Sequence, residues 1–493
     1  MEILVQFLDP TIILFIFLGV FVGIVGGVIP GISPSMTIAL LLPITLYMPK
    51  LAAIVMLLGA YQGSMFGGSI SSILINTPGT AAAAATALDG YKMAMDGQAG
   101  KALHMALYAS CTGGIIGCVM LLIGAQGLAI VTLKFGPPEY FGMMIMSMML
   151  IAGLSGESIL KGLLSAGFGF LFSMVGMDII YGTRRFVFGS MNLMDGISSL
   201  SLFIGLFALS EILVNVIKPR SDLDAKPDIR ASGGKLSLKE YWGERYNLLF
   251  SGAIGSFIGI LPGIGASTAA FLAYAEAQRR SKTPEKFGTG VLAGIAAPET
   301  ATNAQCGGAL VPVLTLGIPG DVVTAIMIGA LVAQGIRPGP LMFTNNIEDV
   351  YLIYTALFLS VIALGIIGTL GLKQFTKILK VKKSFLYPMI LVICFVGTYA
   401  SRSNYFDCLA MVGFGVIGYF FKLAKFPIPP MVIAFVIGPA LESSMRQSLI
   451  ISEVGAMIFF TRPICVLLLL ISLALCVYMV RRNLKTAKSA KPK

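Results

Sequence analysis

Charged residues are scarce in this sequence of 493 residues, because 12% are Asp, Glu, Lys or Arg and 56% are hydrophobic. Soluble domains carry about 25% charged residues, so this composition excludes an ordinary water-soluble protein. Many apolar runs are long enough to span a bilayer as helices. Runs such as 466–480 do not alternate apolar and polar residues, which excludes a transmembrane β-barrel. We therefore expect an all-α polytopic membrane protein with about 10–12 transmembrane helices.

Residues that bind metals or nucleotides are also scarce. His104 is the only histidine, and the seven cysteines form no C-x-x-C pair, which excludes a His/Cys metal site of the usual spacing. The sequence has no G-x-x-x-x-G-K-[ST] loop, which argues against ATP hydrolysis within this chain. The net charge of +12 comes mainly from short loops and the tail, as the positive-inside rule predicts. We expect no organic cofactor and no nucleic-acid partner.

One stretch occurs twice and interrupts a hydrophobic run each time. The copies at 23–35 and 255–267 share a Gly-x₃-Gly-x-x-Pro-Gly-Ile-x-x-Ser skeleton at an offset of 232. Proline removes a backbone donor and clashes with the preceding turn, while glycine permits non-helical conformations, so a helix breaks there. Freed backbone groups are tolerated in a membrane only where protein or a polar cavity satisfies them. Paired breaks of this kind predict the binding site of a transporter.

A second pair of breaks follows the first, at Asn76–Thr80 and Gly317–Gly320. After the earlier one of these, we expect residues 89–101 to form a polar loop. Four interruptions in paired positions predict broken or re-entrant helical hairpins in two repeats. Two further alignments support the pairing: Gly67–Gly68 with Gly307–Gly308, and, after a shift of one residue, Pro78–Gly79 with Pro319–Gly320.

Charge predicts how the segments lie across the membrane. We divide the chain into an N-terminal transmembrane repeat (1–217), a hydrophilic linker (218–245), a C-terminal transmembrane repeat (246–480) and a basic cytoplasmic tail (481–493). Five lysines in 373–383 and six basic residues in the tail belong in the cytoplasm, and an N-terminus with only acidic charges fits the periplasm. The first repeated stretch is then entered from outside and the second from inside. Opposite entry predicts inverted-topology repeats.

The resemblance of this sequence to a known family covers nearly the whole chain. It depends on several motifs in a fixed order, namely Pro30–Gly31–Ile32, Gly67–Gly68–Ser69, Asn76–Thr80, Asp89–Gly90–Tyr91, Ala297–Pro298–Glu299 with Asn303, Gly307–Gly308 and Leu316–Gly320. In these motifs the sequence resembles the TctA family, the large membrane subunit of the tripartite tricarboxylate transporters. Ser33 stands where that family often has a second glycine, and Thr302 where an asparagine often precedes Asn303, so citrate is not assigned as the substrate.

The resemblance implies a permease of the bacterial inner membrane that takes up organic carboxylates with a cation, usually sodium. It also implies two partners, a small TctB-like membrane subunit and a periplasmic TctC-like solute-binding protein. We add the hypothesis of alternating access, in which a unit that carries the break motifs moves against the rest. A proton-coupled carboxylate symporter is the alternative mechanism.

An anionic substrate needs hydrogen-bond donors and positive potential, and the N-terminal end of a half-helix supplies both. Unwound carbonyls and side-chain oxygens suit a hard cation such as Na⁺. The predicted cation-binding or coupling residues are Asn76, Glu299, Asn303 and Thr315. The predicted substrate-binding residues lie at the breaks: Pro30, Gly31, Ser33, Ser35, Asn76, Thr77, Pro78, Gly79, Thr80, Gly263, Gly265, Ser267, Thr268, Gly317, Pro319 and Gly320.

Each of these interpretations has a structural alternative. Pro–Gly pairs with Ser and Thr also permit close helix packing. Glu299 lies between apolar stretches, where a charge costs on the order of 2.5–3.5 kcal/mol, so it either binds a cation, carries a proton or caps the following half-helix. Asp321 follows Pro319–Gly320, and a capping role at a helix start explains it as well as a functional one.

Other classes of function are less consistent with the pattern. Asp178 and Asp321 imitate the pair of an intramembrane aspartyl protease, but Asp178 lies in a polar loop beside Arg184–Arg185 rather than in a helix facing a second carboxylate. A passive channel needs a continuous polar pore, whereas the polar groups here concentrate at the breaks. An assembly scaffold is the remaining alternative. We therefore expect a secondary transporter and not an enzyme.

Overall fold

The computed structural model describes residues 5–154, 158–178, 180–217, 233–379, 381 and 383–489. Its first half contains α2 Pro10–Val28, α3 Pro34–Thr45, α4 Lys50–Ile75, α5 Ala83–Met95, α6 Ala99–Thr132, α7 Pro137–Leu154, α8 Ile159–Ser173, β1 Gly176–Met177, β2 Arg184–Arg185, α9 Ser199–Phe203, the π-helix η2 Ile204–Leu209 and α10 Ser210–Ile217. Its second half contains α11 Leu238–Gly243, α12 Arg245–Ile260, α13 Gly265–Arg280, α14 Leu292–Leu316, α15 Val322–Ala333, α16 Met342–Asn345, α17 Ile347–Ile378, α18 Lys383–Arg402, α19 Tyr405–Leu423, α20 Ile428–Ile451, α21 Ile458–Thr461 and α22 Pro463–Ser489. Short 3₁₀ turns cover Met191–Leu193, Pro284–Lys286 and Gly455–Met457.

The fold is that of an all-α polytopic membrane protein, as predicted. Within the described residues, eight helices are long and apolar enough to cross a membrane, or nine if the bent pair Gly455–Thr461 and Pro463–Met479 forms one span. This number is below the ten to twelve expected. The difference has a simple cause, because three further apolar helices, α3, α8 and α15, have only 10–17 residues. Two of these short helices, α3 and α15, begin at a predicted break.

All four predicted breaks are present. The helix α2 ends at Val28 and α3 begins at Pro34, and α12 ends at Ile260 before α13 begins at Gly265. The second pair lies between α4 and α5 and between α14 and α15. Asn76 ends α4 in the left-handed conformation with φ 51°, and Gly317 ends α14 in the same conformation with φ 68°. Such a residue after the last helical turn is a common helix stop, which glycine and asparagine adopt most readily.

The two halves repeat not only their breaks but also their closest backbone contacts. A Cβ atom at Gly79 would lie 2.0 Å from the carbonyl oxygen of Gly27, and one at Gly320 would lie 2.8 Å from that of Gly259. Glycine is required at both positions because the second break of each half rests directly on the helix before the first break. The same contact in both halves is evidence for an internal repeat.

One detail of the sequence alignment is wrong by one residue. A Cβ at Gly67 would lie 2.4 Å from the carbonyl oxygen of Ile24, and one at Gly308 would lie 2.3 Å from that of Ser256. Ile24 and Ser256 are related by the same offset of 232 that relates the repeated stretches. Gly67 therefore matches Gly308, not Gly307, and the shift of one residue occurs before the glycine pairs rather than after them.

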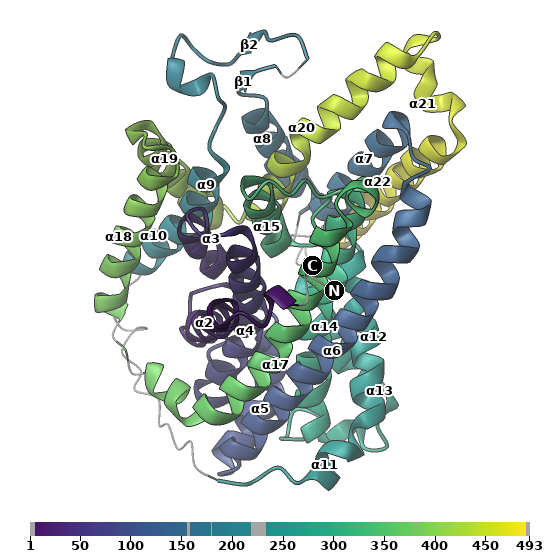
Figure 1. The fold of residues 1–493 in the computed structure, drawn as a ribbon. Coiled ribbons are helices and arrows are strands. Elements are labelled where there is room, and N and C mark those ends of the chain that lie inside the picture. Colours follow the sequence, from purple (N-terminus) through teal and green to yellow (C-terminus); the bar gives the residue numbers. More distant parts are fainter. Residues whose placement is uncertain are drawn as a thin grey trace.

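The longest helix of each half packs against a helix of the other half. The helix α6 of the first half packs against α14 of the second, and α17 of the second half packs against α4 of the first. Figure 1 shows these four helices near the middle of the molecule, with α7, α8, α20 and α22 to one side and α9, α10, α18 and α19 to the other. One large core of buried apolar side chains includes residues of both halves. This packing between the halves brings their breaks close together.

Two further expectations need correction. Asp89 does not lie in a polar loop, because α5 continues to Met95 and the Asp89 side chain is completely buried. Glu299 does not cap a half-helix, because it lies inside α14, which continues through Pro298 and Pro312. Most of the predicted linker, residues 218–232, and the tail end, 490–493, lie outside the described residues.

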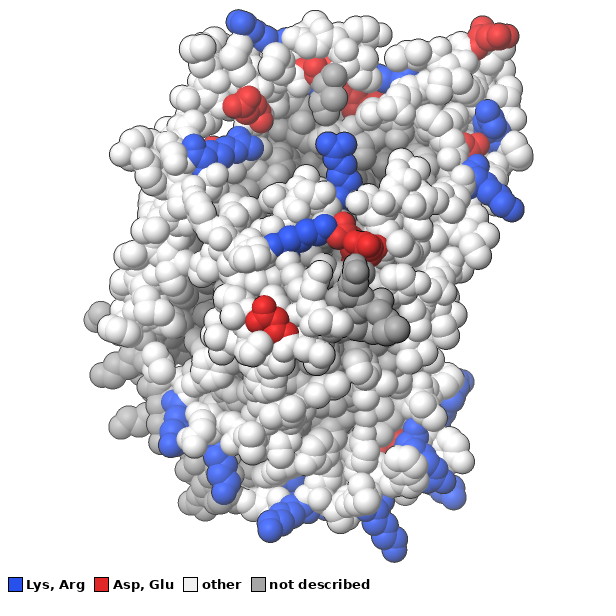
Figure 2. Space-filling view, viewed as in Figure 1, with Lys and Arg blue, Asp and Glu red and all other residues white. Residues whose placement is uncertain are grey.

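The two ends of the molecule differ in charge. Lys and Arg, with little Asp or Glu, gather at the lower end of the face shown in Figure 2, where Figure 1 shows α11 and the start of α6. The upper end carries the antiparallel pair of β1 and β2, in which Gly176 pairs with Arg185, and there both signs of charge occur. A one-sided basic end is typical of a cytoplasmic surface.

Candidate functional site

A cavity of about 280 Å³ lies where the four breaks meet. Gly263 of the third break donates its backbone N–H to the carbonyl oxygen of Gly320 of the fourth over 2.7 Å, so these two tips touch. The cavity is lined by residues from all four breaks, by Met65 of α4 and by two residues of α20: Pro34, Ser35, Met65, Thr80, Ala81, Ala82, Gly263, Ile264, Gly265, Ala266, Ser267, Thr268, Asp321, Val322, Val323, Pro429 and Ile433. We call it the tip cavity.

Four helices begin at the wall of the tip cavity. Its lining includes the first residues of α3, α13 and α15 and the residues that immediately precede α5. The first N–H groups of a helix have no partner within the helix, and together with the helix dipole they favour a negative charge. The N-cap residues of α13 and α5 make no side-chain capping hydrogen bond, although the Thr80 hydroxyl accepts from the Ala83 N–H at the start of α5. The tip cavity therefore combines positive potential with hydrogen-bond donors.

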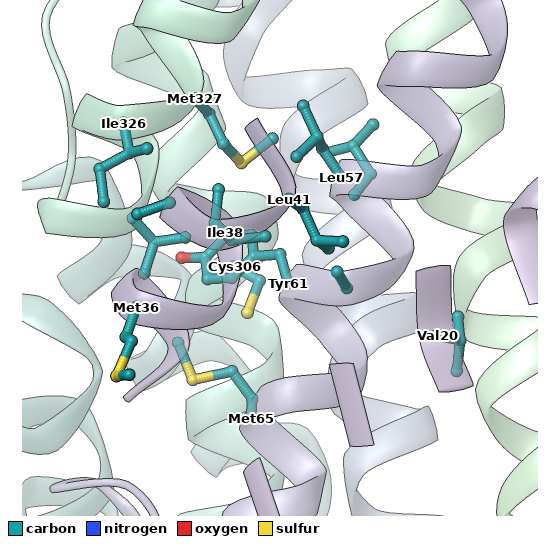
Figure 3. Packing of buried hydrophobic residues seen from close by; sticks show 14 of the residues in the cluster. Val20, Met36, Ile38, Leu41, Leu57, Tyr61, Met65, Cys306, Ile326 and Met327 are labelled. Atoms are coloured by element: carbon teal, nitrogen blue, oxygen red, sulfur yellow. The ribbon is translucent and has the colours of Figure 1, made fainter. Parts of the chain in front are cut away.

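Asp321 lines this cavity, but its carboxylate already accepts hydrogen bonds from other protein groups. It caps α15, accepting a hydrogen bond from the backbone N–H of Thr324 over 2.8 Å, as expected of a capping residue. Its other oxygen accepts from the Tyr61 hydroxyl over 2.7 Å and from Nε2 of Gln305 over 3.1 Å. Figure 3 shows Tyr61 in the core beside Cys306, with Met65 further along α4. Asp321 thus fixes the start of α15 to α4 and α14.

Glu299 lies nearby in a cage of hydroxyl groups. The side chain is 2% exposed and accepts hydrogen bonds from Ser69 of α4, from Thr86 of α5 over 2.5 Å and from Ser110 of α6 over 2.9 Å. No salt bridge to Glu299 occurs among the described residues. Thr86 lies one turn after Ala82, which lines the tip cavity. A buried carboxylate with only neutral donors is suited to take up a cation or a proton.

Two buried amides, one in each half, have unsatisfied atoms. Asn303 follows Glu299 by one turn of α14 and donates to its backbone carbonyl over 3.1 Å, but Oδ1 of Asn303 has no hydrogen-bond partner among the described residues. Gln62 has the corresponding position in α4, and neither its Oε1 nor its Nε2 has such a partner. Buried polar groups without partners are rare in proteins.

Not all of the predicted site residues reach the cavity. Those that line it are Ser35, Thr80, Gly263, Gly265, Ser267 and Thr268. Ser33 lies just behind it, with its hydroxyl 2.9 Å from that of Ser35. Those that belong to the breaks but do not line the cavity are Pro30, Gly31, Asn76, Thr77, Pro78, Gly79, Gly317, Pro319 and Gly320.

The two other predicted cation residues have local roles in the structure. Asn76 is exposed in its left-handed conformation, and Thr315 donates its hydroxyl to the carbonyl of Val311 within α14 over 2.7 Å. Neither forms a hydrogen bond with the Glu299 side chain in the described part of the chain. Glu299 and Asn303 are therefore the two predicted cation residues that the fold brings together.

Sequence reasoning missed several polar contacts between distant helices. Asp89 accepts hydrogen bonds from three backbone N–H groups, of Gly288, Gly290 and Val291, at 2.8–2.9 Å. It also accepts from the hydroxyl of Tyr274 over 2.8 Å, so α5 is fixed to the second half. The Asp89–Gly90–Tyr91 motif was the only sequence feature that pointed to Asp89, and it did not identify the partners of the carboxylate. No group of three or more His, Cys, Asp or Glu side chains suited to a metal occurs in the described parts of the chain.

Known proteins resemble this chain over most of its length. Residues 13–433 match the model of the tripartite tricarboxylate transporter TctA family. The chain belongs to the TctA family. This TctA-family chain is also 37% identical over 482 residues to an uncharacterized 52.8 kDa protein in the TAR-I ttuC' 3'region of Agrobacterium vitis, covering 98% of this chain and 95% of the relative.

A second relative covers part of the chain. It is an uncharacterized protein in the TAR-II ttuC' 3'region of Agrobacterium vitis, 35% identical over 215 residues, which are 44% of this chain and 89% of the relative. No solved structure matches the chain. Membership of the family supports a role as a component of a tricarboxylate transport system, which is a transport rather than a catalytic role.

Proposed function

We propose that this protein is the permease subunit of a binding-protein-dependent secondary transporter that takes up organic di- or tricarboxylates with a cation. The observation that supports this most strongly is the tip cavity, where four helices begin around one shared space. Helix starts of this kind bind anions without any basic side chain. The residues that line the tip cavity include no Lys, Arg or His.

The tip cavity is the proposed substrate site. The open start of α13, at Gly265, Ser267 and Thr268, would bind one carboxylate group through backbone N–H and hydroxyl donors. Ser35 and Thr80 would contact another part of the substrate from the first half. Because both halves supply the wall, relative movement of the halves would open the cavity to one side or the other.

The coupling ion would bind at Glu299. The carboxylate and the unpartnered Oδ1 of Asn303 are oxygen ligands of the kind that Na⁺ prefers, and the cage of hydroxyls would complete the shell. Thr86 would connect this site to the substrate, because α5 borders the tip cavity. If the transporter uses protons instead, Glu299 would be the group that carries them.

The rest of the proposal concerns the setting of the protein. The two halves would be inverted-topology repeats in the bacterial inner membrane, with the N-terminus in the periplasm and the basic end in the cytoplasm. A small TctB-like membrane subunit and a periplasmic TctC-like solute-binding protein would complete the system. Movement of the tips against the rest would give alternating access.

The substrate site can be tested by kinetics. We expect Ser267→Ala to raise the KM for succinate or citrate uptake roughly tenfold, since a hydrogen bond to a charged group contributes that much to affinity. The control is Thr369→Ala, because Thr369 is exposed, bonds only within its own helix and does not line the tip cavity. An unchanged KM in Ser267→Ala and Ser35→Ala together would contradict the proposed site.

A further inference from the structure

A second and larger cavity lies at the end of the molecule that carries β1 and β2. It has a volume of about 530 Å³, and we call it the outer cavity. Its wall is formed by the β1–β2 segment, α8, α9, α15, α20 and the end of α18. It is remote from the basic end, where Figure 1 shows α11. The charge pattern therefore predicts that the outer cavity faces the periplasm.

The outer cavity and the tip cavity share two helices. In α20, Ile433 lines the tip cavity and Val436 lines the outer cavity. These residues are separated by about 4.5 Å of helix rise. In α15, Val323 lines the tip cavity and Ile328 lines the outer cavity, about 7.5 Å further along the helix. Only about one to two helical turns of apolar wall therefore separate the two spaces.

Four charged groups of the outer cavity neutralise one another. Arg185 pairs with Glu442 over 2.6 Å and with Asp178 over 3.6 Å. Arg446 pairs with Asp178 over 2.8 Å and with Glu442 over 2.7 Å. This network fixes the β1–β2 segment to α20. The two positive and two negative charges of the network compensate one another. Nε of Arg185 remains buried without a hydrogen-bond partner among the described residues.

The two other charged side chains that line the outer cavity have no such partner. Arg402, at the end of α18, and Asp195 are exposed, and no hydrogen bond or salt bridge joins either of them to the described residues. Arg402 lies close enough to Asp407 to interact with it electrostatically. Guanidinium groups bind carboxylates through two parallel N–H donors, a geometry that suits a carboxylate more than any other small anion except phosphate.

We propose that the outer cavity is an entrance site for the carboxylate substrate, where Arg402 binds one carboxylate group before the substrate crosses the thin wall to the tip cavity. The charge network holds the β1–β2 segment and α20 as a rigid wall around this site. Asp195 limits the affinity, because its charge repels an anion, so the substrate is not held at the entrance. This inference depends on the proposed function, since it assigns the same carboxylate a first binding position.

The first test is kinetic. We expect Arg402→Gln to raise the KM for citrate uptake roughly tenfold with little change in the maximal rate, and Asp195→Asn to lower the KM. The matched control is Arg184→Gln, because Arg184 belongs to β2 and is exposed but does not line the outer cavity. If Arg402→Gln and Arg184→Gln raised the KM equally, the effect would come from the overall surface charge, and the entrance site would be overturned.

The second test measures access directly. Ser443 lines the outer cavity, its neighbour Ser444 does not, and neither do any of the seven cysteines. We expect a membrane-impermeant, charged thiol reagent to label Ser443→Cys from the outside, and citrate to slow that labelling in Ser443→Cys but not in Ser444→Cys. Absence of outside labelling, or labelling that citrate does not slow in a variant that still transports citrate, would overturn the entrance site alone. Absence of carboxylate transport in the wild type would overturn the proposed function itself.

Discussion

Tyr61 donates its hydroxyl hydrogen to Oδ2 of Asp321 over 2.7 Å, although the two residues are 260 positions apart in the chain. The bond joins the middle of α4, in the first half, to the capping residue of α15, in the second. Both groups are buried, and Asp321 lines the tip cavity. The contact thus couples the shape of the cavity to the packing between the two halves.

Removal of this hydroxyl should weaken the protein. We expect Tyr61→Phe to lower the free energy of unfolding by about 1–2 kcal/mol, because Asp321 loses one of its buried donors while Gln305 and Thr324 remain. A lower thermal midpoint in detergent would show this. The control is Tyr354→Phe, because the Tyr354 hydroxyl is buried without a partner in the described structure. An equal loss of stability in both variants would contradict the assignment.

Glu299 should control coupling more than folding. In Glu299→Gln the hydroxyls of Ser69, Thr86 and Ser110 can still bond to the side chain, since a hydroxyl both donates and accepts. We expect the variant to fold but to lose gradient-driven accumulation by roughly tenfold or more, because the negative charge that binds the cation is gone. Ser360→Ala, which removes a buried hydroxyl that donates to the Ala356 carbonyl within α17, is the control. Normal accumulation by Glu299→Gln would exclude Glu299 as the coupling residue.

Two glycines of α8 should respond differently to the same substitution. A Cβ at Gly169 would lie 2.0 Å from the carbonyl oxygen of Met431 in α20, whereas one at Gly167 would meet nothing within 4 Å. We expect Gly169→Ala to disturb the contact between α8 and α20 and to reduce the yield of folded protein. Gly167→Ala should be neutral or stabilise the helix by up to about 1 kcal/mol. Size-exclusion profiles of the two variants would decide this, and a folded, fully active Gly169→Ala would contradict the packing.

Asn76 should tolerate glycine. Its left-handed conformation at the end of α4 is the one that Gly317 adopts at the end of α14. We expect Asn76→Gly to keep transport and Asn76→Val to lose folded protein, because a β-branched residue is strained at positive φ. Uptake assays on matched amounts of protein would compare them. Loss of transport by a well-folded Asn76→Gly would show instead that the amide itself binds the substrate or the cation.

The breaks were predictable from the sequence because proline and glycine act locally. Pro30–Gly31 and Pro262–Gly263 end their helices wherever the rest of the chain lies. Asp321 was likewise predictable as a cap, since its partner Thr324 is three residues away. The class of membrane protein followed from composition alone. These features depend on neighbours in the chain and not on the fold.

The contacts across the halves were not predictable in this way. Asp89 is followed by Gly90, Tyr91 and Lys92 in the sequence, so a loop was expected, yet its partners lie some two hundred positions away. A cap of the following half-helix was one expectation for Glu299, but α14 continues through Pro298 because buried packing on α6 and α12 outweighs the lost hydrogen bond. The cage of Ser69, Thr86 and Ser110 around Glu299 likewise requires three helices to be placed first.

The central claim is coupled carboxylate transport, and uptake into proteoliposomes tests it most directly. The vesicles would contain this chain and its small partner subunit, with the cognate binding protein outside, and would receive radiolabelled succinate, malate or citrate under a sodium gradient, a proton gradient or neither. We predict accumulation above equilibrium under the sodium gradient. Accumulation under the proton gradient alone would keep the transporter and make Glu299 the proton carrier. Equilibration without accumulation would indicate a channel, and no flux with folded protein and all partners present would contradict the account in favour of a scaffold.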